Sequence, residues 1–349
     1  MTNGILKNTP GFSGNKRSVV GRKTDVTADP YVISEDLLEA FTGWSKMKEV
    51  QIPSQKFFSD IVSEIKVALN DIFPNVRVIC GNDLARGLAK AYLKRVCIRN
   101  TAPLVTLDKV ILPSFEWFPS SEFGYLDVTR AVDEKFETYG LISREGGFGL
   151  AMGRSRPLQT AIAEVAARYS NQKQKITLFD DVIFSGATIS SVISTFQENG
   201  ISVKEVVAAI AIGNTDITVQ VNNVPVIAVY KFDGVIDEVC CRDFIVGTPF
   251  GGRTVVLNDK ARPGKLAYAP YLLPYGCPEK WASIPAGKTR RLSEAMLNLS
   301  AVMWGEIERI NRRKIGTNEL DFPIYRMENS KSIARTLKET ARRLSECRP

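Results

Sequence analysis

The feature that most constrains the fold of this chain is an apolar run that ends in two adjacent aspartates and passes through a Ser-Gly-Ala-Thr turn into a second apolar segment. A short apolar run bounded by turn residues is typical of a buried strand, which we assign to Lys175–Phe179. Asp180–Gly186 is then a turn, and Ala187–Glu198 has the length and pattern of a helix, followed by Gly200 as its C′ residue. The segment therefore predicts a strand, a turn and a helix in succession.

The same succession occurs earlier in the chain. Val76–Cys80 is a short apolar run, Gly81–Gly87 is rich in turn residues, and Leu88–Val96 has a helical pattern. Two further apolar runs, Val203–Ile212 and Val224–Tyr230, predict additional strands. Strands that alternate with helices in this way indicate an α/β fold with a parallel sheet covered on both faces.

Segments of a different kind flank this α/β pattern. Apolar residues at helical spacing predict helices at 34–48 and 54–71, and again at Leu292–Arg313 and Lys331–Cys347. Residues 101–156 are rich in Pro, Gly and aromatic residues, and we expect extended segments and long loops there. We divide the chain into a basic arm at 1–30, a helical N-terminal extension at 31–74, an α/β core at 75–255 and a basic, mainly helical C-terminal region at 256–349.

The balance of charge is basic, with a formal net charge of +8, and residues 1–24 contain no acidic residue. A basic surface suits an anionic partner such as a polyphosphate substrate or a nucleic acid. The alternative interpretation is a basic protein with an untethered N-terminus and no nucleic-acid partner.

The composition excludes several kinds of chemistry. The chain has no histidine, which excludes Ser-His-Asp and Cys-His catalysis and zinc sites that use imidazole. The six cysteines form no Cys-x-x-Cys pair, so we interpret them as reduced residues of a cytoplasmic protein. Since we find neither an uninterrupted apolar stretch long enough for a transmembrane helix nor an apolar signal segment within Met1–Asp25, we expect no membrane partner.

The turn at Asp180–Gly186 has the composition of a phosphate site. Gly186 permits close approach of the backbone to a ligand, the first N–H groups of the following helix favour an anion, and the hydroxyls of Ser185 and Thr188 add donors. The two aspartates would repel a phosphate but could accept hydrogen bonds from a sugar diol. An ordinary capped turn would explain one hydroxyl, but it would not explain the adjacent Asp180 and Asp181, which cost desolvation and mutual repulsion.

The 13 positions from Ile176 to Thr188 resemble the signature of type I phosphoribosyltransferases that binds 5-phosphoribosyl-1-pyrophosphate (PRPP). The resemblance implies a type I phosphoribosyltransferase core, in which Asp180 and Asp181 hold the ribose hydroxyls. It implies that the 5′-phosphate is bound by Ser185, Gly186, Ala187 and Thr188. It also implies that Mg²⁺ arrives with PRPP rather than through a direct protein metal site.

Two further segments resemble other parts of such enzymes. Ala85-Arg86-Gly87 is similar to the Ala-Arg-Gly of adenine phosphoribosyltransferases, which implies that Ala85, Arg86 and Gly87 bind pyrophosphate; the alternative is an arginine in a surface turn. The glycine-rich stretch 145–156 has the character of the flexible catalytic loop, in which Arg154 and Arg156 would neutralise the leaving pyrophosphate. Its alternative interpretation is a basic surface loop.

Asp243-Phe244-Ile245-Val246-Gly247 resembles the segment that lines the purine site of hypoxanthine-guanine phosphoribosyltransferases. The resemblance implies that Phe244 stacks on the acceptor base and that Ile245 offers backbone groups to it. An apolar core strand is the alternative. The sequence departs from that family at 251–253, where Gly-Gly-Arg replaces an expected acidic residue, so purine specificity does not follow.

Three functions are compatible with these residues. The first is a Mg²⁺-dependent phosphoribosyltransferase that uses PRPP and an unknown acceptor base. The second is a protein that binds PRPP or a nucleotide and regulates through contact with nucleic acid. The third is a phosphoribosyltransferase-like effector of a bacterial anti-phage system of the retron type, acting with a partner protein, an association that rests on the extensions and the basic charge. The superfamily usually dimerises, so we expect a homodimer.

Overall fold

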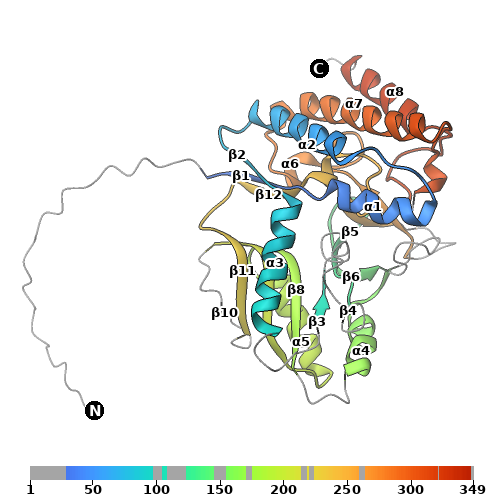
Figure 1. Cartoon of the computed structure of the whole chain (residues 1–349). Coiled ribbons are helices and arrows are strands. Elements are labelled where there is room, and N and C mark those ends of the chain that lie inside the picture. Colours follow the sequence, from blue (N-terminus) through green and yellow to red (C-terminus); the bar gives the residue numbers. More distant parts are fainter. Residues whose placement is uncertain are drawn as a thin grey trace, which may run out of the picture.

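The computed structural model describes residues 29–96, 104–107, 123–144, 155–169, 175–213, 218–219, 224–258, 264–320 and 322–346. Side chains are described for these residues except 92–96, 123–125 and 218–219. Within them, a parallel sheet flanked by helices lies at one end of the molecule and a layer of helices lies at the other (Figure 1). The α/β class predicted from the sequence is confirmed, together with helical extensions.

The central sheet contains the strand that precedes the Ser-Gly-Ala-Thr turn. Its strands lie in the order β10 (Thr218–Val219), β11 (Val224–Phe232), β9 (Val203–Ile212), β8 (Ile176–Ile183), β3 (Leu104–Thr106) and β4 (Phe123–Tyr125). From β11 to β4 the neighbouring strands are parallel, and only β10 pairs antiparallel in the described part of this sheet. The carboxyl ends of these parallel strands meet at one edge, where ligands of open α/β sheets bind.

Helices cover both faces of the central sheet. Because successive side chains of a strand point to opposite faces, Leu178 and Phe179 of β8 enter different clusters of buried residues. The cluster around Leu178 includes side chains of α4 (Leu158–Tyr169) and α5 (Ala187–Glu198). The cluster around Phe179 includes Leu84 and Leu88 of the helix on the other face, α3. α3 spans Gly81–Val96.

A second sheet, the N-terminal sheet, is parallel and has the order β12 (Asp237–Cys240), β1 (Tyr31–Ser34) and β2 (Val76–Ile79). One prediction needs correction here. The alternation of strands and helices predicted a single parallel sheet, but β2 lies in this sheet and not in the central one. β1 was not predicted as a strand. β1 has only three consecutive apolar residues before Ser34, a run shorter than those by which the other strands were predicted.

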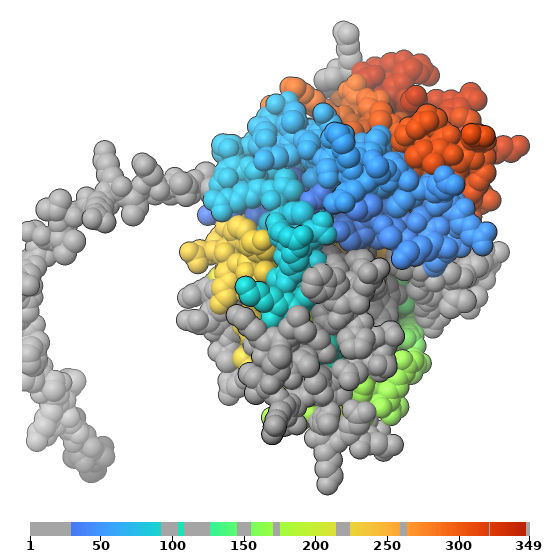
Figure 2. Space-filling view, viewed as in Figure 1, coloured from blue at the N-terminus to red at the C-terminus, as the bar shows by residue number. Residues whose placement is uncertain are grey.

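The N-terminal and C-terminal helices pack into one core. α1 (Leu37–Lys48) and α2 (Gln55–Asn70) pack against α7 (Ala286–Ile310). α7 in turn contacts α6 (Pro278–Trp281) and α8 (Ile333–Glu346). Trp44 of α1 and Trp304 of α7 are fully buried and meet edge to face at 5.5 Å between ring centroids. Figure 2 shows the N-terminal and C-terminal segments side by side on the same part of the surface. The predicted segments 31–74 and 256–349 therefore share a hydrophobic core, although they are distant in sequence.

A third sheet, the lateral sheet, joins the middle of the chain to the C-terminal region. Its order is β14 (Leu266–Ala269), β13 (Arg253–Val256), β5 (Thr129–Val132), β6 (Thr138–Arg144) and β7 (Ser155–Pro157). β13 pairs parallel with β5, and the remaining neighbours are antiparallel. The sheet thereby brings β5 next to a strand more than a hundred residues further along the chain.

The described residues also include short 3₁₀ helices at Cys241–Phe244 (η1) and Thr317–Glu319 (η2). The predicted turn at Gly81–Gly87 is wrong, because the helix α3 begins at Gly81. The predicted helix at 187–198 and strand at 203–212 have the observed bounds. Among the described residues, no helix combines the length and apolarity needed to cross a bilayer.

Candidate functional site

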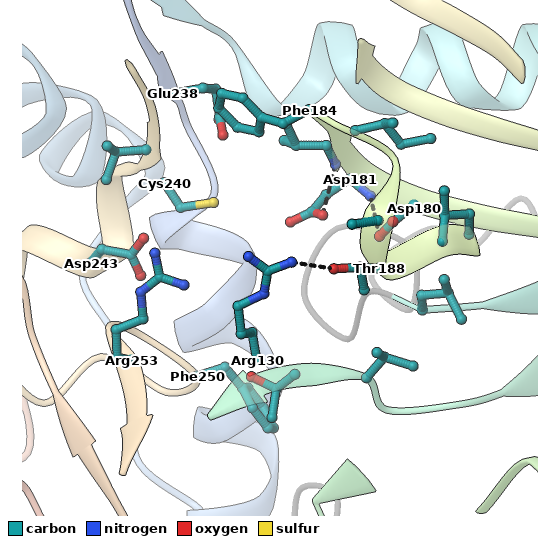
Figure 3. Close-up of a pocket in the computed structure, with 18 of the residues that line it drawn as sticks. Arg130, Asp180, Asp181, Phe184, Thr188, Glu238, Cys240, Asp243, Phe250 and Arg253 are labelled. Atoms are coloured by element: carbon teal, nitrogen blue, oxygen red, sulfur yellow. Dashed lines mark hydrogen bonds between the residues drawn. The ribbon is translucent and has the colours of Figure 1, made fainter. Parts of the chain in front are cut away.

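The carboxyl end of β8 opens into a cavity of about 370 Å³. The other side of the cavity is formed by β12, η1, β13 and β5, so that all three sheets border it. Figure 3 shows Asp180, Asp181 and Thr188 on one side, facing Asp243 and Arg253 on the other. The sequence-predicted turn therefore lies in a cavity whose opposite side comes from distant segments.

The phosphate turn is shorter than predicted. β8 continues through the aspartate pair to Ile183, which leaves Phe184–Gly186 as the turn. Gly186 has a φ of 73°, a left-handed conformation that glycine adopts without steric cost, and it occupies the N-cap position of α5. Glycine has no side chain with which to cap the helix, and Ala187 N–H makes a long hydrogen bond of 3.4 Å to Ser185 Oγ. Residues of the first turn of α5 line the cavity, and a helix N-terminus there favours an anion.

The two aspartates have half-buried side chains that line the cavity. Each accepts a hydrogen bond from the backbone of the next residue: Asp181 N–H donates to Asp180 Oδ1 at 3.1 Å, and Val182 N–H donates to Asp181 Oδ1 at 2.7 Å. These bonds orient the carboxylates at the strand end, where their remaining lone pairs can accept from ligand hydroxyls.

Arginine side chains line the same cavity as this carboxylate pair. Arg130 of β5 donates from Nη2 to Thr188 Oγ1 at 3.1 Å, so it lies at the phosphate turn. Arg144 is paired with the buried Asp127 at 3.0 Å and lies 4.9 Å from the ring centroid of Phe250. The composition signals an excess of positive charge, but the sequence pattern did not single out these arginines because they are not close in sequence to the motif.

Two more arginines come from the segments that follow β12. Arg242 of η1 places Nη2 3.9 Å from Asp181 Oδ2. Arg253 at the start of β13 lies with its guanidinium carbon 5.6 Å from the ring centroid of Tyr271, and its buried Nε has no hydrogen-bond partner among the described residues. Guanidinium groups suit phosphate and carboxylate oxygens because they present several N–H donors in one plane.

Acidic residues with raised pKa values accompany these arginines. Burial raises the pKa of Glu238 to about 8, although a hydrogen bond from Ser34 opposes the shift. Burial also raises the pKa of Asp243 to about 6, opposed by the charge of Arg242. Glu238 therefore keeps its proton to a higher pH than Asp243, whose carboxylate accepts a hydrogen bond from Gly252 N–H at 2.7 Å. Such shifts cluster at functional sites.

The predicted pyrophosphate segment does not reach the cavity. Ala85, Arg86 and Gly87 lie within α3, and none of them lines it; Arg86 is exposed. A Cβ at Gly87 would lie 2.2 Å from Val229 Cγ1, so the glycine permits close packing of α3 on β11. The physical reason is topological: α3 follows β2, which belongs to the N-terminal sheet, whereas β3 is the strand beside β8.

The other predicted residues are also placed by the structure or lie outside it. Phe244 and Ile245 are 0% and 1% exposed and do not line the cavity, so the Phe244 side chain has no open face for a base. The backbone groups of Ile245 pair within the chain, since its N–H donates to the Arg242 carbonyl and its carbonyl accepts from Thr248 N–H. Arg156 lies on β7, pairs with Glu164 at 2.5 Å and is not at the cavity. Arg154 and most of the predicted catalytic loop lie outside the described residues.

The carboxylates of the cavity indicate whether the site suits the Mg²⁺ ion that the sequence resemblance implies. Among the described residues, no group of three or more His, Cys, Asp or Glu side chains could enclose a metal ion. Asp180 and Asp181 nevertheless supply hard oxygen donors, and Mg²⁺ is commonly held by one or two carboxylates together with substrate phosphates. The residues present therefore fit a Mg²⁺ ion that keeps most of its ligands from a bound polyphosphate.

Comparison with known proteins finds no matching family model and no matching curated protein. Solved structures that resemble the chain include a purine phosphoribosyltransferase from Pyrococcus horikoshii, with 12% identity, 45% of this chain and 87% of that chain covered, and a TM-score of 0.29. An adenine phosphoribosyltransferase from Rhodothermus marinus is 14% identical; the match covers 42% of this chain and 78% of that chain, with a TM-score of 0.26. A hypoxanthine phosphoribosyltransferase from Staphylococcus aureus is 10% identical; the match covers 43% of this chain and 73% of that chain, with a TM-score of 0.25.

Proposed function

We propose that this cavity binds PRPP together with Mg²⁺ and that the protein transfers the ribosyl 5-phosphate group to a nitrogenous base. The observation that carries the proposal is the meeting, in one cavity, of a helix N-terminus with glycine at its N-cap and a pair of carboxylates. The turn at 185–188 would hold the 5′-phosphate, and Asp180 and Asp181 would accept hydrogen bonds from the ribose hydroxyls. A phosphate site beside a diol site matches ribose 5-phosphate.

The chemistry requires positioning and charge stabilisation rather than a protein nucleophile. The bond from C1 of the ribose to the pyrophosphate oxygen breaks, its electron pair leaves with pyrophosphate, and the acceptor nitrogen forms a new bond to C1 before it loses its proton. When bound, Mg²⁺ would supply charge neutralisation on the pyrophosphate. The guanidinium groups of Arg130 and Arg253, which line the cavity, are suited to bind oxyanions of the donor.

Calorimetric titration with PRPP and Mg²⁺ tests the proposal directly. We expect the wild type to bind and an Asp180→Asn/Asp181→Asn variant to lose most of its affinity, since the amides cannot replace two anionic acceptors. Asp60→Asn/Glu64→Gln, which removes two exposed carboxylates of α2, is the matched control and should bind as the wild type does. A folded wild type that does not bind PRPP would overturn the proposal.

Pyrophosphate release with a panel of bases is the second measurement. Release that depends on both a base and the aspartate pair supports transfer. Tight binding of PRPP without release for any base would instead favour the regulatory function, in which PRPP or a nucleotide is a signal.

A further inference from the structure

Asp36 is a fully buried carboxylate that does not cap its own helix. It occupies the N-cap position of α1, where an aspartate normally accepts hydrogen bonds from the first-turn N–H groups, but its side chain makes no such bond. Instead, Asp36 Oδ1 accepts from the N–H of Arg242 and from Cys241 Sγ–H, both at 3.3 Å. The side chain therefore serves a contact with η1, more than two hundred residues away in sequence.

The stronger part of this contact is an ion pair. Arg242 Nη1 lies 2.6 Å from Asp36 Oδ2, and the two side chains are 11% and 0% exposed. A buried ion pair of this kind restricts the rotamer of the arginine, because breaking it would leave an uncompensated buried charge. The opposite nitrogen of the same guanidinium, Nη2, lies 3.9 Å from Asp181 Oδ2 in the cavity. One guanidinium thus links the N-terminal segment to the aspartate pair.

A second side chain from the same strand end reaches the same side of the cavity. Ser34, which is 1% exposed, donates from its hydroxyl to Glu238 Oε1 at 2.5 Å. The parallel pairing of β1 with β12, in which Ser34 lies beside Cys240, brings the two elements into register for this contact. Two independent contacts therefore join the carboxyl end of β1 to residues that line the cavity.

We infer that Asp36 is a positioning residue for the PRPP site, an inference that rests on the function proposed above. Asp36 holds the Arg242 guanidinium close enough to Asp181 for its positive charge to stabilise that carboxylate, but too far away to form a direct hydrogen bond with it. Without that anchor, Arg242 is released to pair directly with Asp181 and to compete with the ribose hydroxyls for it. The N-terminal segment is accordingly part of the binding site and not an accessory to it.

Calorimetry with PRPP and Mg²⁺ tests this inference with three variants. We expect Asp36→Asn to weaken PRPP binding by about tenfold or more, which corresponds to about 1.4 kcal/mol. Arg242→Lys keeps the charge but loses the planar fork, and we expect a similar loss. Since both changes break one linkage, the double variant should lose little more than either single variant, the behaviour of coupled neighbours.

The matched control is Glu308→Gln. Glu308 is also a buried carboxylate in an ion pair, 3.0 Å from Lys314, but it lies on α7 and does not line the cavity. We expect this variant to lower the melting temperature and to leave PRPP affinity unchanged, which separates a positioning role from a general loss of stability.

The outcomes are distinguishable. If the wild type binds PRPP and both Asp36→Asn and Arg242→Lys bind it equally well, the inference is wrong and the proposed function stands. If Asp36→Asn does not fold, Arg242→Lys decides alone. If the folded wild type does not bind PRPP, both the proposed function and the inference are overturned.

Discussion

The two sides of the cavity are built in different ways. One side is a continuous stretch, Asp180–Ile189, which runs from the end of β8 through the turn into α5. The other side is assembled from short pieces of β5, β12, η1 and β13. We refer to these as the continuous wall and the assembled wall.

This difference determines which functional residues can be recognised from the sequence and which only from the structure. The continuous wall supplies backbone N–H groups and carboxylates whose geometry follows from a strand, a glycine turn and a helix in sequence. The assembled wall supplies Arg130, Arg242 and Arg253, which meet only because three sheets border one cavity. Changes in the continuous wall should therefore affect a ligand directly, whereas changes behind the assembled wall should act through its packing.

The largest expected effect is a loss of stability caused by a substitution in the core behind the assembled wall. Phe244 is fully buried and packs edge to face against Tyr271 at 6.4 Å between ring centroids. We expect Phe244→Ala to reduce the free energy of unfolding by about 3–5 kcal/mol, the usual cost of emptying such a site. Chemical denaturation measures this. A variant of wild-type stability with altered base selectivity would instead support the sequence-based interpretation of Phe244 as a base-stacking residue.

The next effect sharpens the role of the continuous wall. Gly186 and Gly200 both have positive φ, at 73° and 78°, and an added Cβ would meet at most Ile189 Cγ2 at 3.9 Å. We expect Gly186→Val and Gly200→Val to cost roughly 1–2 kcal/mol of stability each, because a β-branched residue is strained in this conformation. Only Gly186→Val should also weaken PRPP binding, by about tenfold. Equal PRPP affinities of the two variants would show that the turn does not contact the ligand.

A smaller effect is the pH dependence of folding stability that arises from Glu238 of the assembled wall. Burial raises the pKa of Glu238 to about 8, so the folded protein retains a proton that the unfolded chain releases near the ordinary pKa of glutamate. Stability from this group is present at low pH and is lost as pH rises toward about 8. Glu39, with a pKa raised to about 7 mainly by burial, acts in the same direction.

Melting temperatures measured from pH 5 to pH 8 check this, over the window set by the ordinary and raised pKa values. We expect a fall of several degrees in the wild type and a smaller fall in Glu238→Gln, which cannot lose a proton. An identical pH dependence in the two proteins would contradict the assignment of a raised pKa to Glu238.

The smallest effect is expected at the edge of the continuous wall. Phe184 is 42% exposed and lines the cavity. Phe184→Ala should leave stability within about 0.5 kcal/mol of the wild type, because little burial is lost. PRPP affinity should change by roughly two- to fivefold, less than one factor of ten or 1.4 kcal/mol. Ile236→Ala, at 38% exposure away from the cavity, is the matched control and should leave affinity unchanged.

Particular elements show how far sequence reasoning reached. The helix Ala187–Glu198 and the strand Val203–Ile212 were predicted with their observed bounds, since the helical pattern, the apolar run and the glycine between them are local signals. The turn expected at Gly81–Gly87 is helical, and its glycine at position 87 serves packing on β11. A Gly-rich turn signal and a glycine required by close helix–strand contact look alike in sequence.

By itself, the sequence determined the continuous wall, because a strand, a left-handed glycine and a helix N-terminus are specified by neighbouring residues. Tertiary structure alone decided that β2 leaves the central sheet, that Asp36 reaches Arg242, and that Arg253 faces the aspartate pair across the cavity. The physical reason is that strand order and the burial of ion pairs depend on contacts between segments far apart in the chain, for which local periodicity carries no signal.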